Sequence, residues 1–117
     1  MDATTTNQLA IDKLRQERRE TEEKIDHLRM DLRHMGEPTA DETDIDAYER
    51  EKTLALVQSM ERKLESLDRA ILIAQRGTYG ICEQCGTRID PARLDILPHA
   101  TLCLKCQRDF ERRNRRI

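Results

Sequence analysis

Apolar residues recur with helical spacing in two long segments of this chain. The stretch from Asn7 to Met35 contains neither proline nor glycine, and the same holds from Ile45 to Arg76. Between them lies GEPTADETD, which is typical of a turn because it combines glycine, proline and short polar residues. The pattern therefore predicts two long helices joined by a turn.

The apolar residues of each segment form one narrow stripe, at the a and d positions of a heptad repeat. A narrow stripe with charged residues on the other faces favours an antiparallel coiled-coil hairpin, with each helix roughly 45 Å long at about 1.5 Å per residue. The register is interrupted at Arg18 and Thr21, and again at Arg50 and Thr53, which predicts imperfect packing there. The stripe residues are Ile11, Leu14, Ile25, Leu28, Leu32 and Met35 in the first helix, and Val57, Met60, Leu64, Leu67, Ile71 and Ala74 in the second.

Four cysteines follow the second helix as two Cys-x-x-Cys pairs. Cys82 and Cys85 form the first pair, Cys103 and Cys106 form the second, and 17 residues separate the pairs. This spacing lets four thiolates complete a tetrahedron around one ion, and zinc prefers such a site. The sequence therefore predicts one structural Zn²⁺ bound by these four residues. Gly86 supplies the permissive backbone that a tight turn around sulfur needs.

Other uses of the thiols fit less well. The N-terminal MDATTTNQLAIDK has no positive lead and no apolar run, so we expect no signal peptide, no membrane span and a cytoplasmic, reducing location, which disfavours disulfides. A redox protein needs one Cys-x-x-Cys at a helix start and no second pair. His99 is close enough in sequence to suggest a site of three cysteines and one histidine, but with four cysteines present we expect it to be a solvated loop residue.

Composition limits the size of any core. Of the 117 residues, 37% are hydrophobic and 38% are charged, and there is no tryptophan. Such a chain cannot fill a broad core, so a thin helical shape held by a metal is favoured. A closed four-cysteine site leaves no position for water or substrate, and no catalytic set of side chains is evident. We therefore expect that the protein is not an enzyme.

The predicted fold is mainly α: an antiparallel two-helix coiled-coil hairpin over residues 1–76, then a small four-cysteine zinc-finger module with a short basic C-terminal helix over residues 77–117. Gly77 and Gly80 end the second helix. The first part carries 13 basic and 18 acidic residues, the second 8 and 5. The acidic excess gathers at the hairpin bend. The acidic tip covers about residues 37–47, and two further acidic residues flank it. Together these are Glu37, Asp41, Glu42, Asp44, Asp46, Glu49 and Glu51.

These features together resemble the DksA/TraR family of zinc-containing transcription regulators. The likeness is strongest in GTYGICEQCGTRIDPARLDILPHATLCLKC, and the hairpin extends it over nearly the whole chain. The resemblance implies a bacterial protein that binds RNA polymerase directly and inserts its coiled coil into the secondary channel. Acidic tip residues then modulate initiation, often together with ppGpp. The matching positions are Gly80, Cys82, Cys85, Gly86, Ile89, Arg93, Leu94, Pro98, Cys103 and Cys106.

The chain departs from that family at two places. The family tip reads Asp-x-x-Asp-x-Ala, whereas here Asp41 and Asp44 keep the spacing, Asp46 holds the third position and alanine comes one residue later. The resemblance still assigns the tip function to these three residues. Basic positions that help to bind ppGpp fall on Ser66, Leu97 and Gln107, so we do not expect conventional ppGpp binding at that surface.

Two further functions remain open as alternatives. A zinc-dependent nucleic-acid-binding protein would use the basic C-terminus, although the acidic arm disfavours duplex DNA and we expect no sequence-specific DNA binding. A thiol redox sensor would use oxidation of the zinc thiolates. Under the main interpretation, Arg93, Arg108 and Arg112 are candidates for docking to polymerase. The basic residues of the C-terminus are Lys105, Arg108, Arg112, Arg113, Arg115 and Arg116.

Overall fold

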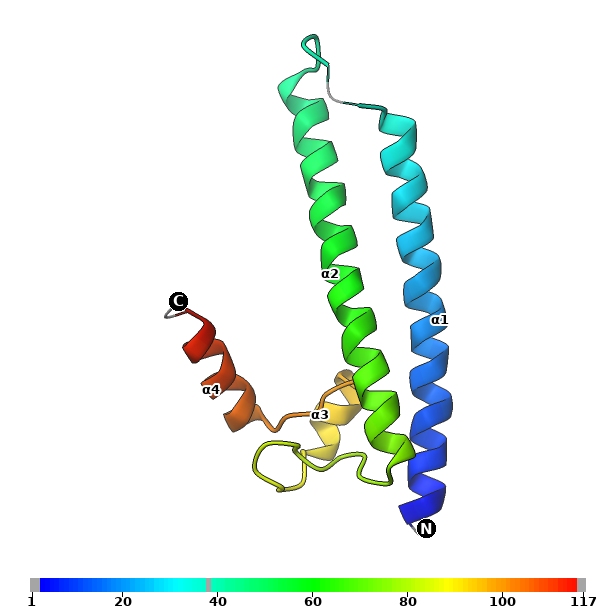
Figure 1. Ribbon diagram of the computed structural model, residues 1–117, viewed down its shortest axis with the longest axis vertical. Coiled ribbons are helices and arrows are strands. Elements are labelled where there is room, and N and C mark those ends of the chain that lie inside the picture. Colours follow the sequence, from blue (N-terminus) through cyan, green and yellow to red (C-terminus); the bar gives the residue numbers. More distant parts are fainter. Residues whose placement is uncertain (1–2, 38, 116–117) are drawn as a thin grey trace.

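The computed structural model describes residues 3–37 and 39–115, and its described part contains helices but no β-strand. Helix α1 (Ala3–Met35) and helix α2 (Asp44–Gln75) run antiparallel, and the short helices α3 (Pro91–Ile96) and α4 (Leu104–Arg115) lie near the base of this hairpin (Figure 1). The molecule measures 60 × 34 × 20 Å. The predicted fold class is confirmed, but α3 was not predicted. No described helix combines the length and apolar character that a membrane span requires.

Local sequence signals define both ends of α2. Thr43 is its N-cap, and the Thr43 hydroxyl accepts a hydrogen bond from the Asp46 N–H at 3.1 Å. At the other end the Gly77 N–H donates to Ala74 O and the Thr78 N–H donates to Ile73 O, which is a Schellman motif. Gly77 has a φ of +87°, so glycine is the residue that this turn favours.

The hairpin core is a single seam between α1 and α2, and it is best buried near the base. Leu14 and Leu67 are fully buried there, and Tyr79 packs against the same cluster. Toward the tip the predicted stripe becomes less buried, and Met35 is exposed. The seam therefore weakens with distance from the base.

Polar contacts occupy the places where the heptad register is interrupted. The Arg18 side chain donates to Asp68 of α2 at 2.5 Å and to Glu22 at 2.7 Å. Thr21 is buried, and its hydroxyl donates to the Glu17 carbonyl at 2.8 Å. These positions thus remain within the seam even though they break the apolar stripe.

The segment after α2 has its own small apolar cluster, formed by Cys82, Ile89 and Cys106. Helix α3 begins where Asp90 accepts a hydrogen bond from the Ala92 N–H at 3.0 Å and Pro91 occupies the first helical turn. Among the described helices, only α1 and α2 pack closely against each other. Helices α3 and α4 are therefore held by loops and by the cysteine cluster.

Three contacts join the module to the base of the hairpin. Asn7 of α1 is buried, and its side chain donates to Gly77 O at 3.3 Å and accepts from the Tyr79 N–H at 3.0 Å. Arg69 of α2 pairs with Glu83 at 2.8 Å. Within the module, the Tyr79 hydroxyl donates to Pro98 O at 3.0 Å. The boundary at residues 76 and 77 stays a prediction, and it coincides with this turn.

The seam near the base should dominate the stability of the hairpin. Replacing Leu67 by Ala removes a fully buried side chain, so we expect the free energy of unfolding to fall by about 2–5 kcal/mol. The control is Leu54→Ala, because Leu54 lies on the same helix but is 47% exposed. Urea unfolding of the zinc-loaded protein, followed by circular dichroism, measures both losses. Equal losses would contradict this description of the core.

Candidate metal centre and acidic tip

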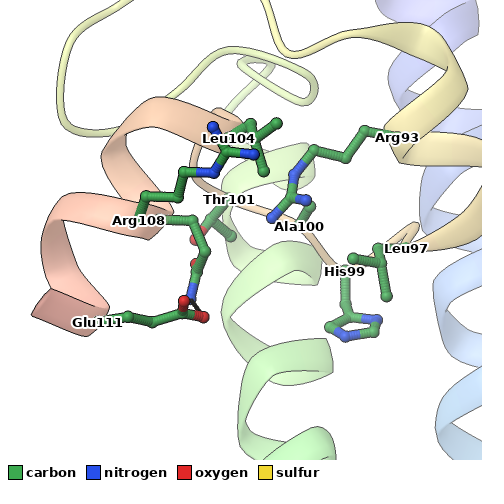
Figure 2. A pocket seen from close by; sticks show the side chains of 9 residues that line it. Arg93, Leu97, His99, Ala100, Thr101, Leu104, Arg108 and Glu111 are labelled. Atoms are coloured by element: carbon green, nitrogen blue, oxygen red, sulfur yellow. Dashed lines mark hydrogen bonds between the residues drawn. The ribbon is translucent and has the colours of Figure 1, made fainter.

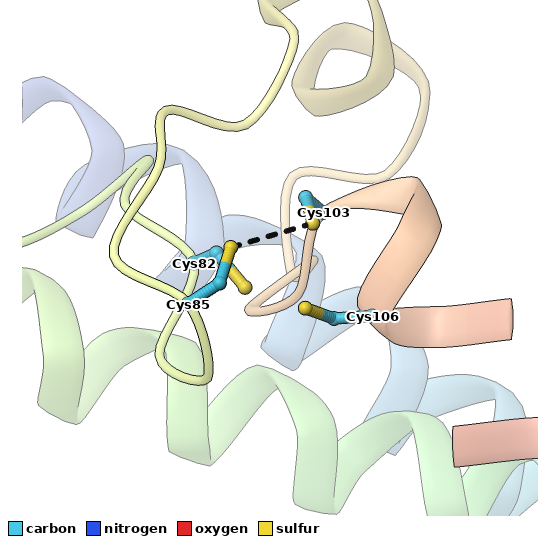
Figure 3. Close-up of side chains that lie close together, drawn as sticks. All are labelled: Cys82, Cys85, Cys103 and Cys106. Carbon is cyan, nitrogen blue, oxygen red and sulfur yellow. Dashed lines mark hydrogen bonds between the residues drawn. The ribbon is translucent and has the colours of Figure 1, made fainter. Parts of the chain in front are cut away.

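The four cysteines converge from two separate segments of the chain. Cys82 and Cys85 lie in the loop after α2, Cys103 precedes α4, and Cys106 lies in the first turn of α4 (Figure 3). All four sulfur atoms lie within 4.8 Å of one another, and the Cys85 and Cys103 sulfurs are 3.8 Å apart. A tetrahedral site with Zn–S bonds of about 2.3 Å places its sulfurs about 3.8 Å apart. The donor set and its spacing therefore fit zinc.

Backbone hydrogen bonds shape the first knuckle. The Cys82 N–H donates to Thr87 O at 2.8 Å, and the Gly86 N–H donates to Cys82 O at 2.9 Å. Gly86 has a φ of +77°, as its place in the sequence predicted. The Glu83 N–H donates to Thr101 O at 2.9 Å, which ties the first knuckle to the segment leading into the second.

The thiols of Cys82 and Cys106 differ in acidity when no cation is bound. Burial would raise the pKa of Cys82, but hydrogen bonds with backbone groups of Cys103, Cys85 and Gln84 outweigh it and lower the pKa to about 6. A hydrogen bond with the Cys103 side chain, together with burial, raises the pKa of Cys106 to about 12. Zinc binds thiolates, so loading the site releases the protons that the less acidic thiols hold.

The acidic tip is a short turn at the far end of the hairpin from the cysteines (Figure 1). Gly36 ends α1 with a φ of +71°, and the Glu42 N–H donates to Thr39 O at 3.1 Å. The turn and the first part of α2 line a shallow hollow of about 540 Å³ with mainly acidic side chains. Its lining residues are Met35, Glu37, Thr39, Asp41, Glu42, Asp46, Glu49 and Arg50.

The three tip aspartates have different surroundings. Asp46 accepts a hydrogen bond from the Thr43 hydroxyl at 2.7 Å, so its carboxylate is part of the cap of α2. Asp41 and Asp44 are exposed, and neither carboxylate makes a hydrogen bond or an ion pair with any described residue. These two carboxylates are therefore available to a partner, whereas Asp46 has a structural task.

Comparison with known proteins decides the family. The model of the prokaryotic dksA/traR C4-type zinc finger matches residues 77–112. The RNA polymerase-binding transcription factor DksA of Caulobacter vibrioides is 36% identical over 99 residues, which cover 83% of this chain and 67% of that protein. The solved structure of the transcription factor DksA2 from Pseudomonas aeruginosa aligns with a TM-score of 0.77 and 30% identity, covering 98% of this chain and 93% of that one. The chain belongs to the DksA/TraR family.

Other members match over less of their length. The DksA protein of Escherichia coli is 33% identical over 89 residues, which cover 72% of this chain and 59% of that protein. The C4-type finger of the DksA/TraR family agrees with the sulfur geometry, so the chain carries one structural zinc site. The named DksA relatives are transcription factors rather than enzymes.

Two of the three predicted docking arginines share a surface on this DksA/TraR module. Arg93 of α3 and Arg108 of α4 line a shallow pocket of about 400 Å³ between the two helices, together with His99 (Figure 2). The third, Arg112, is paired with Asp109 at 2.8 Å, so its charge is partly compensated. Arg116 lies outside the described residues.

The same pocket contains Leu97 and Gln107, two of the positions at which the family resemblance placed ppGpp-binding side chains. Neither is basic. His99 is half-buried rather than solvated, so that expectation was wrong. Burial lowers the pKa of His99, and the nearby charge of Lys63 lowers it further. The neighbouring Pro98 is buried, and its carbonyl accepts a hydrogen bond from the Tyr79 hydroxyl, a long-range contact that no local pattern predicts.

Zinc removal should loosen the module while most of the hairpin's helicity survives, because the two parts have separate apolar clusters. Metal analysis of the reduced protein should find one zinc per chain. Circular dichroism and amide NMR before and after chelation should show that α4 loses order while α1 and α2 persist. A Cys82→Ser chain should resemble the chelated protein without any chelator. A single cooperative loss of all helical signal would contradict the separation.

Proposed function

We propose that this protein is a transcription regulator that binds RNA polymerase directly, inserts its acidic-tipped hairpin into the secondary channel and modulates initiation. The observation that carries the proposal is the agreement with the DksA2 structure over almost the whole chain, combined with two exposed aspartates at the far end of a thin arm that pair with no described residue. A 60 Å molecule whose narrow end is a two-helix hairpin has a shape that suits a deep, narrow opening.

The tip acts through charge in this proposal. A polymerase active site holds divalent cations, which attract carboxylates and are sensitive to unit charges placed a few ångströms away. Asp41 and Asp44 are exposed and pair with no described residue, so they can approach such cations without first breaking an ion pair. Asp46 contributes chiefly by capping α2 and holding the turn that presents the other two.

The base supplies most of the affinity. It offers a broader surface than the tip, and Arg93, Arg108 and Arg112 give it positive charge that suits an acidic rim on the polymerase. Zinc, held by Cys82, Cys85, Cys103 and Cys106, fixes the surface that carries these arginines. Four thiolates fill its coordination sphere, so the metal has no position for substrate. Ser66, Leu97 and Gln107 lack positive charge, so we expect action without conventional ppGpp binding there.

Neutralising the tip should separate function from affinity. We expect Asp44→Asn, and next Asp41→Asn, to remove most of the effect on initiation while polymerase binding persists. Asn is nearly isosteric, and stability should change by less than about 1 kcal/mol. Asp46→Asn should act more weakly on initiation and chiefly loosen the cap.

The measurement pairs polymerase binding with in vitro initiation for each variant. Asp26→Asn is the control, because Asp26 is an exposed carboxylate of α1 away from the tip. Unchanged initiation with all three tip aspartates neutralised would mean that the acidic tip is only a solvated turn.

Duplex DNA should bind weakly, because the arm is acidic and phosphates repel it. Polymerase binding, in contrast, should compete with other factors that occupy the secondary channel. Electrophoretic mobility shifts at physiological salt, with and without polymerase, measure both. A shift of duplex DNA by the protein alone would favour the nucleic-acid-binding alternative.

A further inference from the structure

Arg50 occupies a place in α2 where the heptad stripe calls for an apolar residue. Its side chain is only 18% exposed, and its ion-pair partner Glu42 is 14% exposed. By comparison, the pair of Arg29 and Glu61 farther down the same seam is 54% and 44% exposed. The pair at the tip is thus the more deeply buried of these two inter-segment pairs.

The Arg50 guanidinium joins three segments at once. Its Nε donates to the Glu42 carboxylate at 3.1 Å, and a terminal nitrogen donates to the same oxygen. The terminal nitrogens also donate to the carbonyl oxygens of Gly36 and of Met35, the latter at 3.4 Å. One side chain of α2 therefore binds the end of α1 and the middle of the turn.

Physical reasons favour arginine at this position. The last carbonyls of a helix lack partners within it and lie at the negative end of its dipole, so a cation there is stabilising. Glu42 neutralises the charge that burial would otherwise penalise. The planar fork of arginine spreads its N–H donors over three nitrogens, which reach a carboxylate and two carbonyls together, whereas the three donors of lysine share a single nitrogen.

The contact also divides the acidic residues of the tip. Glu42 turns inward to Arg50, whereas Asp41 and Asp44 on either side of it remain exposed. We propose that Arg50 is a positioning residue, which locks the turn between α1 and α2 so that Asp41 and Asp44 point outward in a fixed arrangement. This inference rests on the proposed function of the tip, but the lock itself can be measured without polymerase.

The test compares Arg50→Met, Arg50→Lys and Glu42→Gln with wild type. Methionine is a good helix former and suits a stripe position, so Arg50→Met should stay folded. Arg62→Met is the matched control, since Arg62 is an exposed arginine of the same helix. Each full-length, zinc-loaded chain is assayed for amide hydrogen exchange, polymerase binding and initiation in vitro.

In Arg50→Met the amides of Gly36 and Glu42 should exchange at least roughly tenfold faster, while those near Leu67 are unchanged. Polymerase binding should stay within about twofold. The effect on initiation should fall about tenfold, because a misplaced group loses much of its action. Arg50→Lys and Glu42→Gln should be intermediate, and Arg62→Met should match wild type.

A double variant distinguishes a positioning role of Arg50 from a merely structural one. Adding Asp44→Asn to Arg50→Met should cause little further loss, because the aspartate is already misplaced. Unchanged exchange at the tip overturns the lock. Full activity of Arg50→Met beside an inactive Asp44→Asn overturns the positioning role while leaving the proposed function intact. If Arg50→Met exchanges faster at the tip but Asp41→Asn and Asp44→Asn both keep full activity, the proposed function is overturned. This role for Arg50 then falls with it.

Discussion

The arm of this protein depends on one seam. Among the described helices, α1 and α2 pack only against each other, so each buries a single narrow stripe and no third helix corrects their alignment. The seam is tight at the base, where Leu14 and Leu67 are fully buried, and loose toward the tip, where Met35 is exposed. The ends of such a hairpin must therefore be fixed by contacts other than apolar packing.

The base meets this need with polar contacts and metal. Asn7, Tyr79 and the pair of Arg69 and Glu83 tie the module to the hairpin. Among its described residues the module buries only Cys82, Ile89, Pro98 and Cys106 well, which is too little apolar surface for a stable fold. Structural zinc contributes on the order of 10 kcal/mol or more in small modules, enough to offset that deficit. Helix α4 packs closely against no other described helix, so the cysteine cluster is what holds its start in place.

Patterns with a short period were readable from the sequence. The heptad stripe predicted both long helices, the cysteine spacing predicted the metal centre, and Gly77 and Gly86 predicted turns that do adopt positive φ. Helix α3 was missed although it has a recognisable start, an Asp90 cap followed by Pro91. Its six residues are too few for any apolar period to show.

Contacts between distant residues could not be read in this way. Arg50 and Thr53 looked like defects in the stripe, because nothing in a local window shows that the carbonyls at the end of α1 lie beside Arg50. The same is true of Asn7, whose partners are about 70 residues away in the chain. Half-buried His99 belongs to this class as well, because the loop that carries it is placed by Pro98 and Tyr79.

The tip illustrates how a charged turn can be both stable and available. Several carboxylates in a short segment repel one another, and pairing all of them would leave none for a partner. Here Glu42 and Asp46 are used within the molecule, by Arg50 and by the cap of α2. Their contacts fix the backbone on either side of Asp41 and Asp44, which stay exposed. Asp41 and Asp44 are thus carried on a backbone whose neighbouring side chains are anchored, and this lets a weakly packed end of a long seam present their charge at a defined place.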